Sequence, residues 1–378
     1  MLRLKLCLFL VFLGLVGCGT GSSGSINSDI PPDPNVAPPP TASGSLIPTV
    51  TLDDKDASNP GRISLIIGGV SYQETDSETT EFKVVEYTQD NLTVVEDGVV
   101  QGKLLTEDSG LSLDVAFIID NTGSMAEEIA GVRSSVLQFI DTLRAGGQDV
   151  QAGIVAFNDG LPNSFDNNVD PEDLRAKPAI YGFRNLEDDF SESGNLYSFI
   201  ASLRATDPGR NFDLPELAFA GLDFARRTFT WRDNAQRVYI LVTDDSAWGR
   251  GYPGTANDKG IDEDYFTDET LAKLLRDEGS VVHAYSPAPK SENFLSAGEY
   301  NVKPLTDITG GIWNELNRSG EFDLLELGIT DVTLASTKVE FVKNGDPNEI
   351  MKRKVRVVVR VEDNGKVYDG ERIVEIDY

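Results

Sequence analysis

The sequence predicts an α/β fold in which a doubly wound, mostly parallel sheet is inserted into, or flanked by, a small β-sandwich. Two observations give this prediction. Residues 109–320 alternate apolar strand-like runs with helix-like segments, which is typical of a sheet covered by helices on both faces. Residues 49–108 and 325–378 instead hold short β-branched runs separated by Asp, Asn and Gly, which is typical of sandwich strands.

The chain begins with the features of a secretory signal. Residues 1–17 place two cations before an apolar run that is too short to span a membrane. Residues 15–18 (LVGC) resemble the lipobox of bacterial lipoproteins, in which the cysteine, here Cys18, receives acyl chains. The alternative is an ordinary signal with a chance cysteine.

Residues 18–48 are rich in Gly, Ser and Pro, and they predict a disordered tether behind the lipidated cysteine. We therefore expect a protein of the bacterial cell envelope, held at the membrane by its lipid. Gly19, directly after the cysteine, favours the outer membrane under the enteric sorting rule.

The chain is strongly acidic. It has 33 basic and 62 acidic residues, and loss of Arg3 and Lys5 with the signal leaves a net charge of −31. Such a chain repels nucleic acid and attracts cations and basic partners. We therefore expect no nucleic-acid partner.

The elements of the middle region follow one another in α/β order. The predicted first helix runs from Met125 to Leu143, and Thr267 and Gly279 bound a later one. Apolar runs predict strands over residues 113–120, 150–157, 237–245 and 280–286, and further helices over 194–205 and 215–229.

The flanking regions predict strands over residues 48–52, 62–72, 81–88, 91–105, 331–343 and 352–378, with a hairpin turn at 363–365 (DNG). We expect both flanks to pair into one sandwich, because each half alone buries little apolar surface. Two separate small β domains are the alternative.

Oxygen-bearing side chains gather where predicted strands end. Asp120, Thr122 and Ser124 alternate after the first strand of the middle region, and Asp244, with Asp245 beside it, ends a later one. The stretch 211–216 (NFDLPE) adds Asn211, Asp213 and Glu216 just before a helix. Ligands of doubly wound sheets bind at the carboxyl ends of the strands. Hard oxygens from three loops suit Mg²⁺ or Mn²⁺.

Each of these segments also has a purely structural interpretation. Ser124 can cap a helix that follows a polar turn, a carboxylate such as Asp244 often ends a strand, and NFDLPE can be a helix start with proline in the first turn. Their order and their shared sheet edge favour the cation site.

These residues carry a family resemblance. Residues 120–125 (DNTGSM), 241–245 (LVTDD) and 305–311 (LTDITGG) resemble a von Willebrand factor A domain over about residues 110–318. The family's metal-ion-dependent adhesion site has the form Asp-x-Ser/Thr-x-Ser, with further ligands from two later loops. NFDLPE and residues 231–237 (WRDNAQR) are similar to the A-like domain of integrin β subunits, in which the Glu reaches the central metal.

The resemblance implies three metal positions. The central site would hold Mg²⁺ or Mn²⁺, and a flanking site would hold Ca²⁺. A third position uses two acidic residues, which are Glu here instead of Asp, although a helix N-terminus favours Glu in any case. The implied ligands are Asp120, Thr122, Ser124, Glu216 and Asp244 for the central site; Asp159, Asn211, Asp213 and Glu216 for the flanking site; and Glu127 and Glu128 for the third.

Two polar loops remain. In the integrin-like family an insertion at the position of residues 158–180 helps to choose the partner, and the alternative is a solvated loop. Residues 257–268 do not match the spacing of an EF-hand, and they predict a surface loop.

We expect a lipid-anchored binding or adhesion module that captures an Asp or Glu carboxylate of a protein partner through the cation. The alternatives are an envelope scaffold with a stabilising metal and a metal-dependent hydrolase. We expect no enzyme, because His283 is the only histidine and lies in a strand-like run, and no Gly-rich phosphate loop is present.

Overall fold

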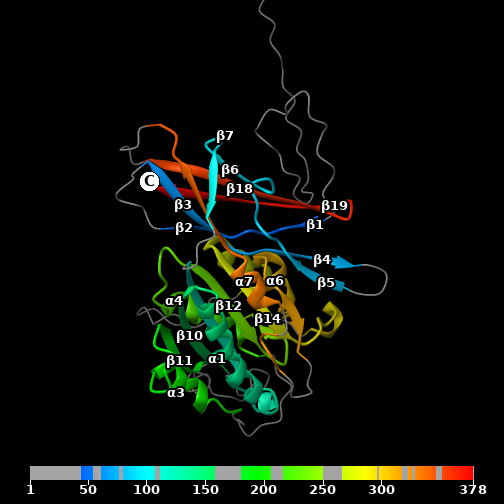
Figure 1. Cartoon of the computed structure of the whole chain (residues 1–378). Helices are drawn as coiled ribbons and strands as arrows, with labels where there is room; N and C mark the ends of the chain where they lie inside the picture. The colour runs from blue at the N-terminus through cyan, green and yellow to red at the C-terminus, as the bar shows by residue number, and fades with distance from the viewer. Residues whose placement is uncertain are drawn as a thin grey trace, which may run out of the picture.

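The computed structural model has a β-sandwich at one end and an α/β domain at the other (Figure 1). The part of the chain that it describes covers residues 44–53, 61–75, 80–106, 111–157, 180–205, 216–249, 266–295, 298–316, 322–325, 328–345 and 351–377.

The α/β domain is built on a six-stranded sheet with the order β11-β10-β9-β12-β14-β16. All neighbouring strands are parallel except edge strand β11, which runs antiparallel to β10. The predicted doubly wound, mostly parallel sheet is thus confirmed. Its strands are β9 (Ser112–Asp120), β10 (Asp149–Phe157), β11 (Ile180–Glu187), β12 (Gln236–Val242), β14 (Ser280–Ser286) and β16 (Trp313–Glu315).

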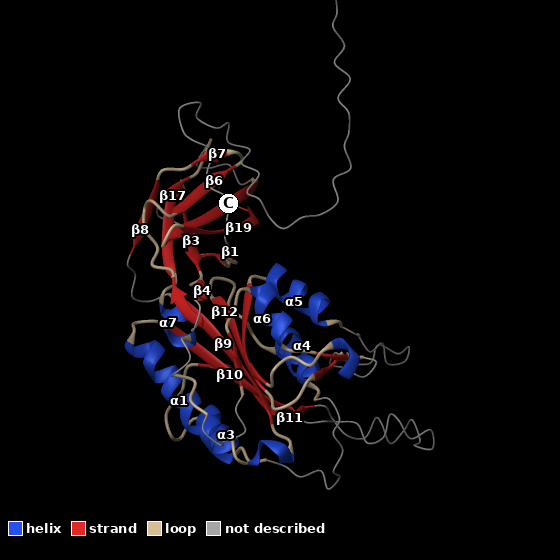
Figure 2. Ribbon diagram, turned by 90° about the vertical axis from the view of Figure 1, so that its right-hand side faces the viewer, coloured by secondary structure: helices blue, strands red, loops and turns tan. Residues whose placement is uncertain are grey.

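Helices cover both faces of this sheet (Figure 2). One face packs against α1 (Ile129–Ala145), α3 (Asn195–Ser202) and α7 (Ile329–Leu334). The other packs against α4 (Ala218–Thr228), α5 (Asp268–Asp277) and α6 (Lys303–Thr309). Because both faces are covered, the central strand β9 is buried from its second residue, Leu113, to Asp120.

Short elements complete this domain. They are the 3₁₀ helices η1 (Gly123–Ala126) and η2 (Glu292–Phe294) and the antiparallel pair β13 (Ala247–Trp248) and β15 (Glu299–Tyr300).

The sandwich takes strands from both flanks of the α/β domain. One sheet has the order β1-β19-β18-β6-β7 and the other β2-β3-β17-β8, so each sheet mixes early and late strands. Apolar side chains of both sheets form one core. The flanks that the structure describes therefore make a single sandwich.

The sandwich strands are β1 (Gly44–Ser45), β2 (Val50–Leu52), β3 (Arg62–Ile67), β6 (Leu92–Glu96), β7 (Val99–Val100), β8 (Lys103–Thr106), β17 (Thr337–Val342), β18 (Lys352–Asp363) and β19 (Lys366–Asp377). A separate hairpin of β4 (Ser71–Thr75) and β5 (Thr80–Val84) places Phe82 and Val84 against the α/β core. The predicted DNG turn joins β18 to β19, with positive φ at Asn364 (49°) and Gly365 (74°), as such a turn requires.

The boundaries differ from the prediction at both junctions. Residues 331–334, expected to begin a strand, belong to helix α7, because Ile329 and Val332 pack into the α/β core. The α/β domain thus extends past residue 320, and the sandwich resumes only at β17. At the other junction, Leu46 is buried in the sandwich core, so residues 44–48 are structured and do not belong to the tether.

The two parts meet at the amino ends of the parallel strands. Gln236, the first residue of β12, accepts a hydrogen bond at its Oε1 from Ser336 Oγ (2.7 Å), just before β17. Across the same junction, Arg372 of β19 donates to the carbonyl of Arg276 in α5 (2.6 Å). The carboxyl ends of the strands therefore point away from the sandwich (Figure 2).

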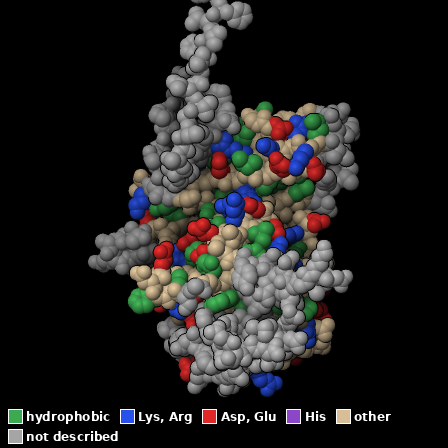
Figure 3. All heavy atoms as spheres, turned by 180° about the vertical axis from the view of Figure 1, so that it is seen from behind, with side chains coloured by type: hydrophobic (Ala, Val, Ile, Leu, Met, Phe, Trp, Pro, Cys, Tyr) green, Lys and Arg blue, Asp and Glu red, His purple; other side chains and the backbone are tan. Residues whose placement is uncertain are grey.

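The charged surface is mixed. On the face shown in Figure 3, acidic and basic side chains are interspersed. Of the helices in the described ranges, none is long and apolar enough to cross a membrane.

Candidate metal centre

Three buried carboxylates converge at the carboxyl edge of the sheet. Asp120 is the last residue of β9, Asp244 follows β12 and Glu216 precedes α4. Each offers an oxygen, and these atoms lie within 4.8 Å of one another. Among the described residues, this is the group of three potential acidic, histidine or cysteine ligands that comes so close together.

Asp120 is held by its immediate neighbours in the chain and by β12. Its Oδ1 accepts hydrogen bonds from the backbone N–H (2.9 Å) and the hydroxyl (2.7 Å) of Thr122. Its Oδ2 accepts from Thr243 Oγ1 (2.9 Å). The N–H of Asn121 donates to the carbonyl of Phe157, which ties the turn to β10. The alternation of side chains in residues 120–124 thus places one hydroxyl directly on the carboxylate.

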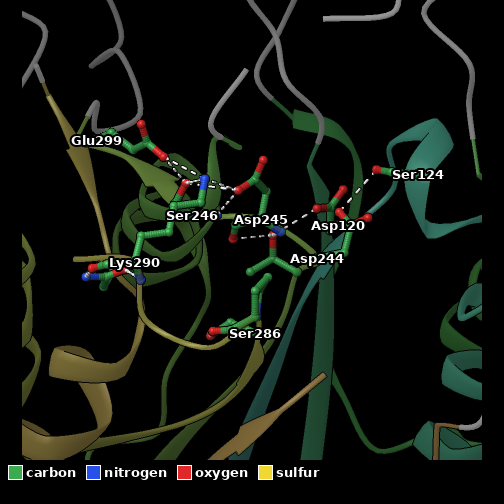
Figure 4. Close-up of polar contacts among 11 residues, drawn as sticks. Asp120, Ser124, Asp244, Asp245, Ser246, Ser286, Lys290 and Glu299 are labelled. Carbon is green, nitrogen blue, oxygen red and sulfur yellow. Dashed lines mark hydrogen bonds and ion pairs between the residues drawn. The ribbon is translucent and has the colours of Figure 1, made fainter. Parts of the chain in front are cut away.

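The second hydroxyl joins the first loop to the third. Ser124 Oγ lies 3.1 Å from Asp244 Oδ1 (Figure 4). It also lies 2.9 Å from Thr122 Oγ1. With the Thr122–Asp120 bond this makes three oxygen–oxygen contacts, but Thr122 and Ser124 supply only one hydroxyl proton each. One of the three contacts therefore has no proton between its two oxygens. Oxygen atoms that face one another without enough protons are the ligands that a hard cation binds.

Ser124 does not cap the following helix, as the structural interpretation would require. Residues 123–126 form the 3₁₀ helix η1, which has no side-chain cap, and α1 begins only at Ile129. The expected helix start at Met125 was therefore wrong by one turn. Met125 is buried in the core and anchors the intervening turn.

Glu216 is positioned by a short strand that the sequence did not reveal. Its N–H donates to the carbonyl of Ser246 (2.9 Å), and its carbonyl accepts from the N–H of Trp248 (2.8 Å). It thus forms a parallel bridge with β13, opposite Ala247. Helix α4 starts at Ala218, two residues later, so Glu216 belongs to the loop and not to the predicted helix.

Burial and mutual repulsion of carboxylates perturb the centre. Burial, and next the nearby charge of Asp244, raise the pKa of Asp120 to about 7, and the hydrogen bonds from Thr122 and Thr243 only partly oppose this. A cation among these oxygens would oppose both effects, because it would favour the ionised form of each carboxylate.

A second polar cluster adjoins the centre, and no pattern in the sequence predicts it. The ammonium of Lys290 contacts Asp245, Ser246 and Glu299 (Figure 4). Burial alone would lower the pKa of Lys290, but its bonds to Asp245 and Glu299 raise it above the usual value. These residues come from the loop after β12, the loop after β14 and strand β15, so only the tertiary structure brings them together.

The described residues leave the flanking and third metal sites untested. Glu127 is exposed and Glu128 is buried, so the two side chains of the implied third site differ in environment. Asp159, Asn211, Asp213, Cys18 and most of the two polar loops (158–179 and 257–265) lie outside the described residues.

His283 lies within β14, away from the carboxylates. Its Nδ1 accepts a hydrogen bond from the backbone N–H of Ile312 (3.0 Å), and its side chain is buried. Burial lowers the pKa of His283 to about 3, so the imidazole is neutral and serves the packing of β14 against β16.

Comparison with known proteins gives one family match. Residues 114–296 match the family model described as von Willebrand factor type A domain. This range includes Asp120, Glu216 and Asp244. It also includes Lys290, Asp245 and Ser246, and it ends before Glu299.

Individual relatives are distant. The alpha-protein kinase vwkA of Dictyostelium discoideum is 25% identical over 147 residues, which are 38% of this chain and 20% of that protein. Proximal thread matrix protein 1 from the mussel byssus, in a structure with a zinc-occupied MIDAS motif, superimposes with a TM-score of 0.37 and 17% identity over 62% of this chain and 49% of that one. A second structure of the same mussel protein gives 0.37 and 16%, over 64% and 51%. The chain thus spans about a fifth of the curated relative and about half of the structural ones.

Proposed function

We propose that this chain, whose residues 114–296 belong to the von Willebrand factor type A domain family, captures an acidic group of a protein partner through a divalent cation. The cation would be held by Asp120, Thr122, Ser124, Glu216 and Asp244. The observation that carries the proposal is the convergence of the three carboxylates, from three separate segments, to within 4.8 Å.

The structure fits a cation better than it fits a structural polar cluster. Buried carboxylates are normally paired with a base, because an unpaired buried charge is strongly unfavourable. The hydrogen bonds of Asp120 come from two hydroxyls and one backbone N–H, all uncharged. By contrast, Asp223 in the same domain is equally buried but lies against Arg226 and Arg227.

The donor set favours Mg²⁺ or Mn²⁺. All five candidate ligands offer oxygen, and none of them offers nitrogen or sulfur, so the set suits hard cations. Two of the five are neutral hydroxyls, which leave the bound ion more electrophilic than an all-carboxylate set would. The ion when bound supplies a position that a carboxylate from outside can take. We extend the proposal to a flanking Ca²⁺ at Asp159, Asn211, Asp213 and Glu216 on the sequence resemblance alone.

Binding is favoured over catalysis by the side chains around the carboxylates. The only histidine is neutral, buried and bonded to the backbone of Ile312, so it cannot serve as a general base at the centre. Lys290 is held as an ammonium by two carboxylates, so it is not a nucleophile. We therefore propose that the protein is not an enzyme.

The arrangement of the two parts suits display of the site. The sandwich contacts the amino ends of the parallel strands, whereas the carboxylates lie at the opposite ends. With Cys18 lipidated, the tether would enter at β1 in the sandwich and the metal centre would face away from the anchor. We propose a lipid-anchored protein of a bacterial cell envelope, in the outer membrane.

The test compares partner capture by the native chain and by Glu216→Gln. Each protein, with Cys18→Ser to remove the lipid, is immobilised and exposed to envelope extract in Mg²⁺ or in chelator, and the retained proteins are identified. We expect a set of proteins that only the native chain retains, and only in Mg²⁺.

Unfolding temperatures in chelator and in Mg²⁺, measured beside partner capture, separate the binding function from a purely structural metal. A binder keeps its metal-free unfolding temperature on Glu216→Gln and loses its partners. If the Mg²⁺-dependent rise in unfolding temperature disappears in the variant while the same proteins are still retained, the metal is structural and the adhesion proposal is wrong.

A further inference from the structure

Lys290 stands at a fixed place beside the metal centre. It lies between β14 and η2, and its backbone is clamped by the side chain of Asn301. The N–H of Lys290 donates to Asn301 Oδ1 (2.8 Å), and Asn301 Nδ2 donates to the carbonyl of Lys290 (2.9 Å). These two bonds fix the position of the Lys290 backbone independently of the contacts of its side chain.

The ammonium of Lys290 donates hydrogen bonds to three oxygens. Nζ lies 2.7 Å from Asp245 Oδ1, 2.9 Å from Glu299 Oε1 and 3.0 Å from Ser246 Oγ. The Ser246 hydroxyl also donates to Glu299. Glu299 is only 5% exposed, so it needs a positive partner, and Lys290 provides one.

This cluster is connected to the metal ligands through the backbone. Asp245 follows Asp244 directly, and its Oδ1 accepts from the N–H of Ser246 (2.7 Å). The carbonyl of Ser246 in turn accepts the N–H of Glu216 (2.9 Å). Asp244 is therefore linked to the cluster through its peptide bond to Asp245, and Glu216 through its hydrogen bond to Ser246.

We propose that Lys290 is a positioning residue of the metal centre, a built-in cation that joins the loops after β12 and before β15 and so places Glu216 and Asp244. The inference rests on the proposed metal function. Its physical basis is the set of bonds that the ammonium makes to Asp245, Ser246 and Glu299: without them the two loops are no longer joined by a cation, and the Ser246 carbonyl is free to move away from Glu216. Loss of a residue that orients metal ligands commonly weakens metal affinity by about 10- to 100-fold.

The experiment replaces Lys290 with methionine, which keeps the length of the side chain and removes its charge. Mg²⁺ and Mn²⁺ affinities are measured by calorimetry on the full chain carrying Cys18→Ser. Amide hydrogen exchange at Glu216 and Trp248 is measured on the same chain in chelator. We expect metal affinity to fall at least about tenfold, and both amides to exchange faster without metal.

Lys303→Met is the matched control. Lys303 is similarly exposed (35% against 37% for Lys290) and pairs with Asp307 on α6, outside the metal cluster. This variant should leave affinity and both amides unchanged. If Lys290→Met also leaves affinity within twofold of native and both amides unchanged, Lys290 does not position the centre.

A double variant distinguishes a positioning role of Lys290 from mere neutralisation of the buried Glu299. It also replaces Lys290→Met in the affinity measurement if that single variant does not fold. In Lys290→Met with Glu299→Gln, the unpaired buried carboxylate is removed. We expect folding to be retained and affinity to stay low. Recovery of native affinity would show that the ammonium only neutralises Glu299, and the positioning role would be wrong.

The exchange measurement also distinguishes failure of this inference from failure of the proposed function. If the native chain binds no metal, the metal function fails. Faster exchange at Glu216 and Trp248 in Lys290→Met would still establish that Lys290 holds this loop, whereas unchanged exchange would remove both proposals.

Discussion

Asp120→Asn has opposite effects on the metal-free and metal-bound protein if the centre holds a cation. In the native protein the pKa of Asp120 is raised to about 7 by burial and by Asp244, against about 3.9 in an unfolded chain. Holding this carboxylate ionised at pH 8 therefore costs about 4 kcal/mol of folding free energy. Asparagine keeps the acceptor for Thr122 and can donate to Thr243, so it removes the charge and keeps the shape.

These free energies give the expected changes in unfolding temperature. In chelator at pH 8 the variant should unfold above the native protein, by up to roughly 7–15 °C, because the cost of the buried charge has gone. With Mg²⁺ at about 100 times its dissociation constant, the native protein should gain about 2.7 kcal/mol. For a domain of this size that is a rise of roughly 5–10 °C, and the variant should show none of it.

Differential scanning calorimetry in chelator and in Mg²⁺ measures both effects. Asp223→Asn is the matched control, since Asp223 is also fully buried but is paired with Arg226 and Arg227. That control should lose about 1–3 kcal/mol in both buffers and keep the rise with Mg²⁺. A metal-free Asp120→Asn that is strongly destabilised, together with no response of the native protein to metal, would refute the cation site.

Three further outcomes are expected. The apparent Mg²⁺ affinity should fall about tenfold per pH unit below pH 7, because binding must displace the proton of Asp120. The free energy of unfolding of the metal-free protein should instead rise as the pH falls. The stabilisation from protonated Asp120 is complete below about pH 4 and is lost as the pH rises through 7. A flat affinity between pH 5.5 and 7.5 would contradict this. Arg232→Met should cost about 3–5 kcal/mol by calorimetry and keep the rise with Mg²⁺, because Arg232 neutralises buried Asp114 and contacts Asp149 at the strand ends away from the centre; a loss below 1 kcal/mol would show that the network is dispensable. The imidazole of His283 should show no titration between pH 5 and 8 by NMR, since burial lowers its pKa to about 3, and a midpoint in that range would place it in contact with solvent.

Part of the site is local, and for that part the sequence was sufficient. Asp120, Thr122 and Ser124 lie within five residues, and their hydrogen bonds follow from a strand that ends in a tight turn. The DNG hairpin is local in the same sense, because positive φ at two residues selects Asn and Gly. The alternation of strands and helices also sufficed, because each apolar run is long enough to show its own period.

Helix α7 marks the limit of local interpretation. The segment 331–334 is β-branched at two of its four positions and was expected to extend a strand, but burial of Ile329 and Val332 in the α/β core holds it in a helix. Weak local preference is overridden by tertiary packing, as is usual for short segments.

The sequence by itself determined the fold class, the first loop of the centre and the types of its candidate ligands. Only the tertiary structure decided how Glu216 is held, because its partner strand β13 begins 31 residues later in the chain. The same is true of Lys290, whose contact with Asp245 joins residues 45 apart. Such pairs leave no period or motif in a single chain, because their interaction depends on two loops that meet only after the sheet has folded.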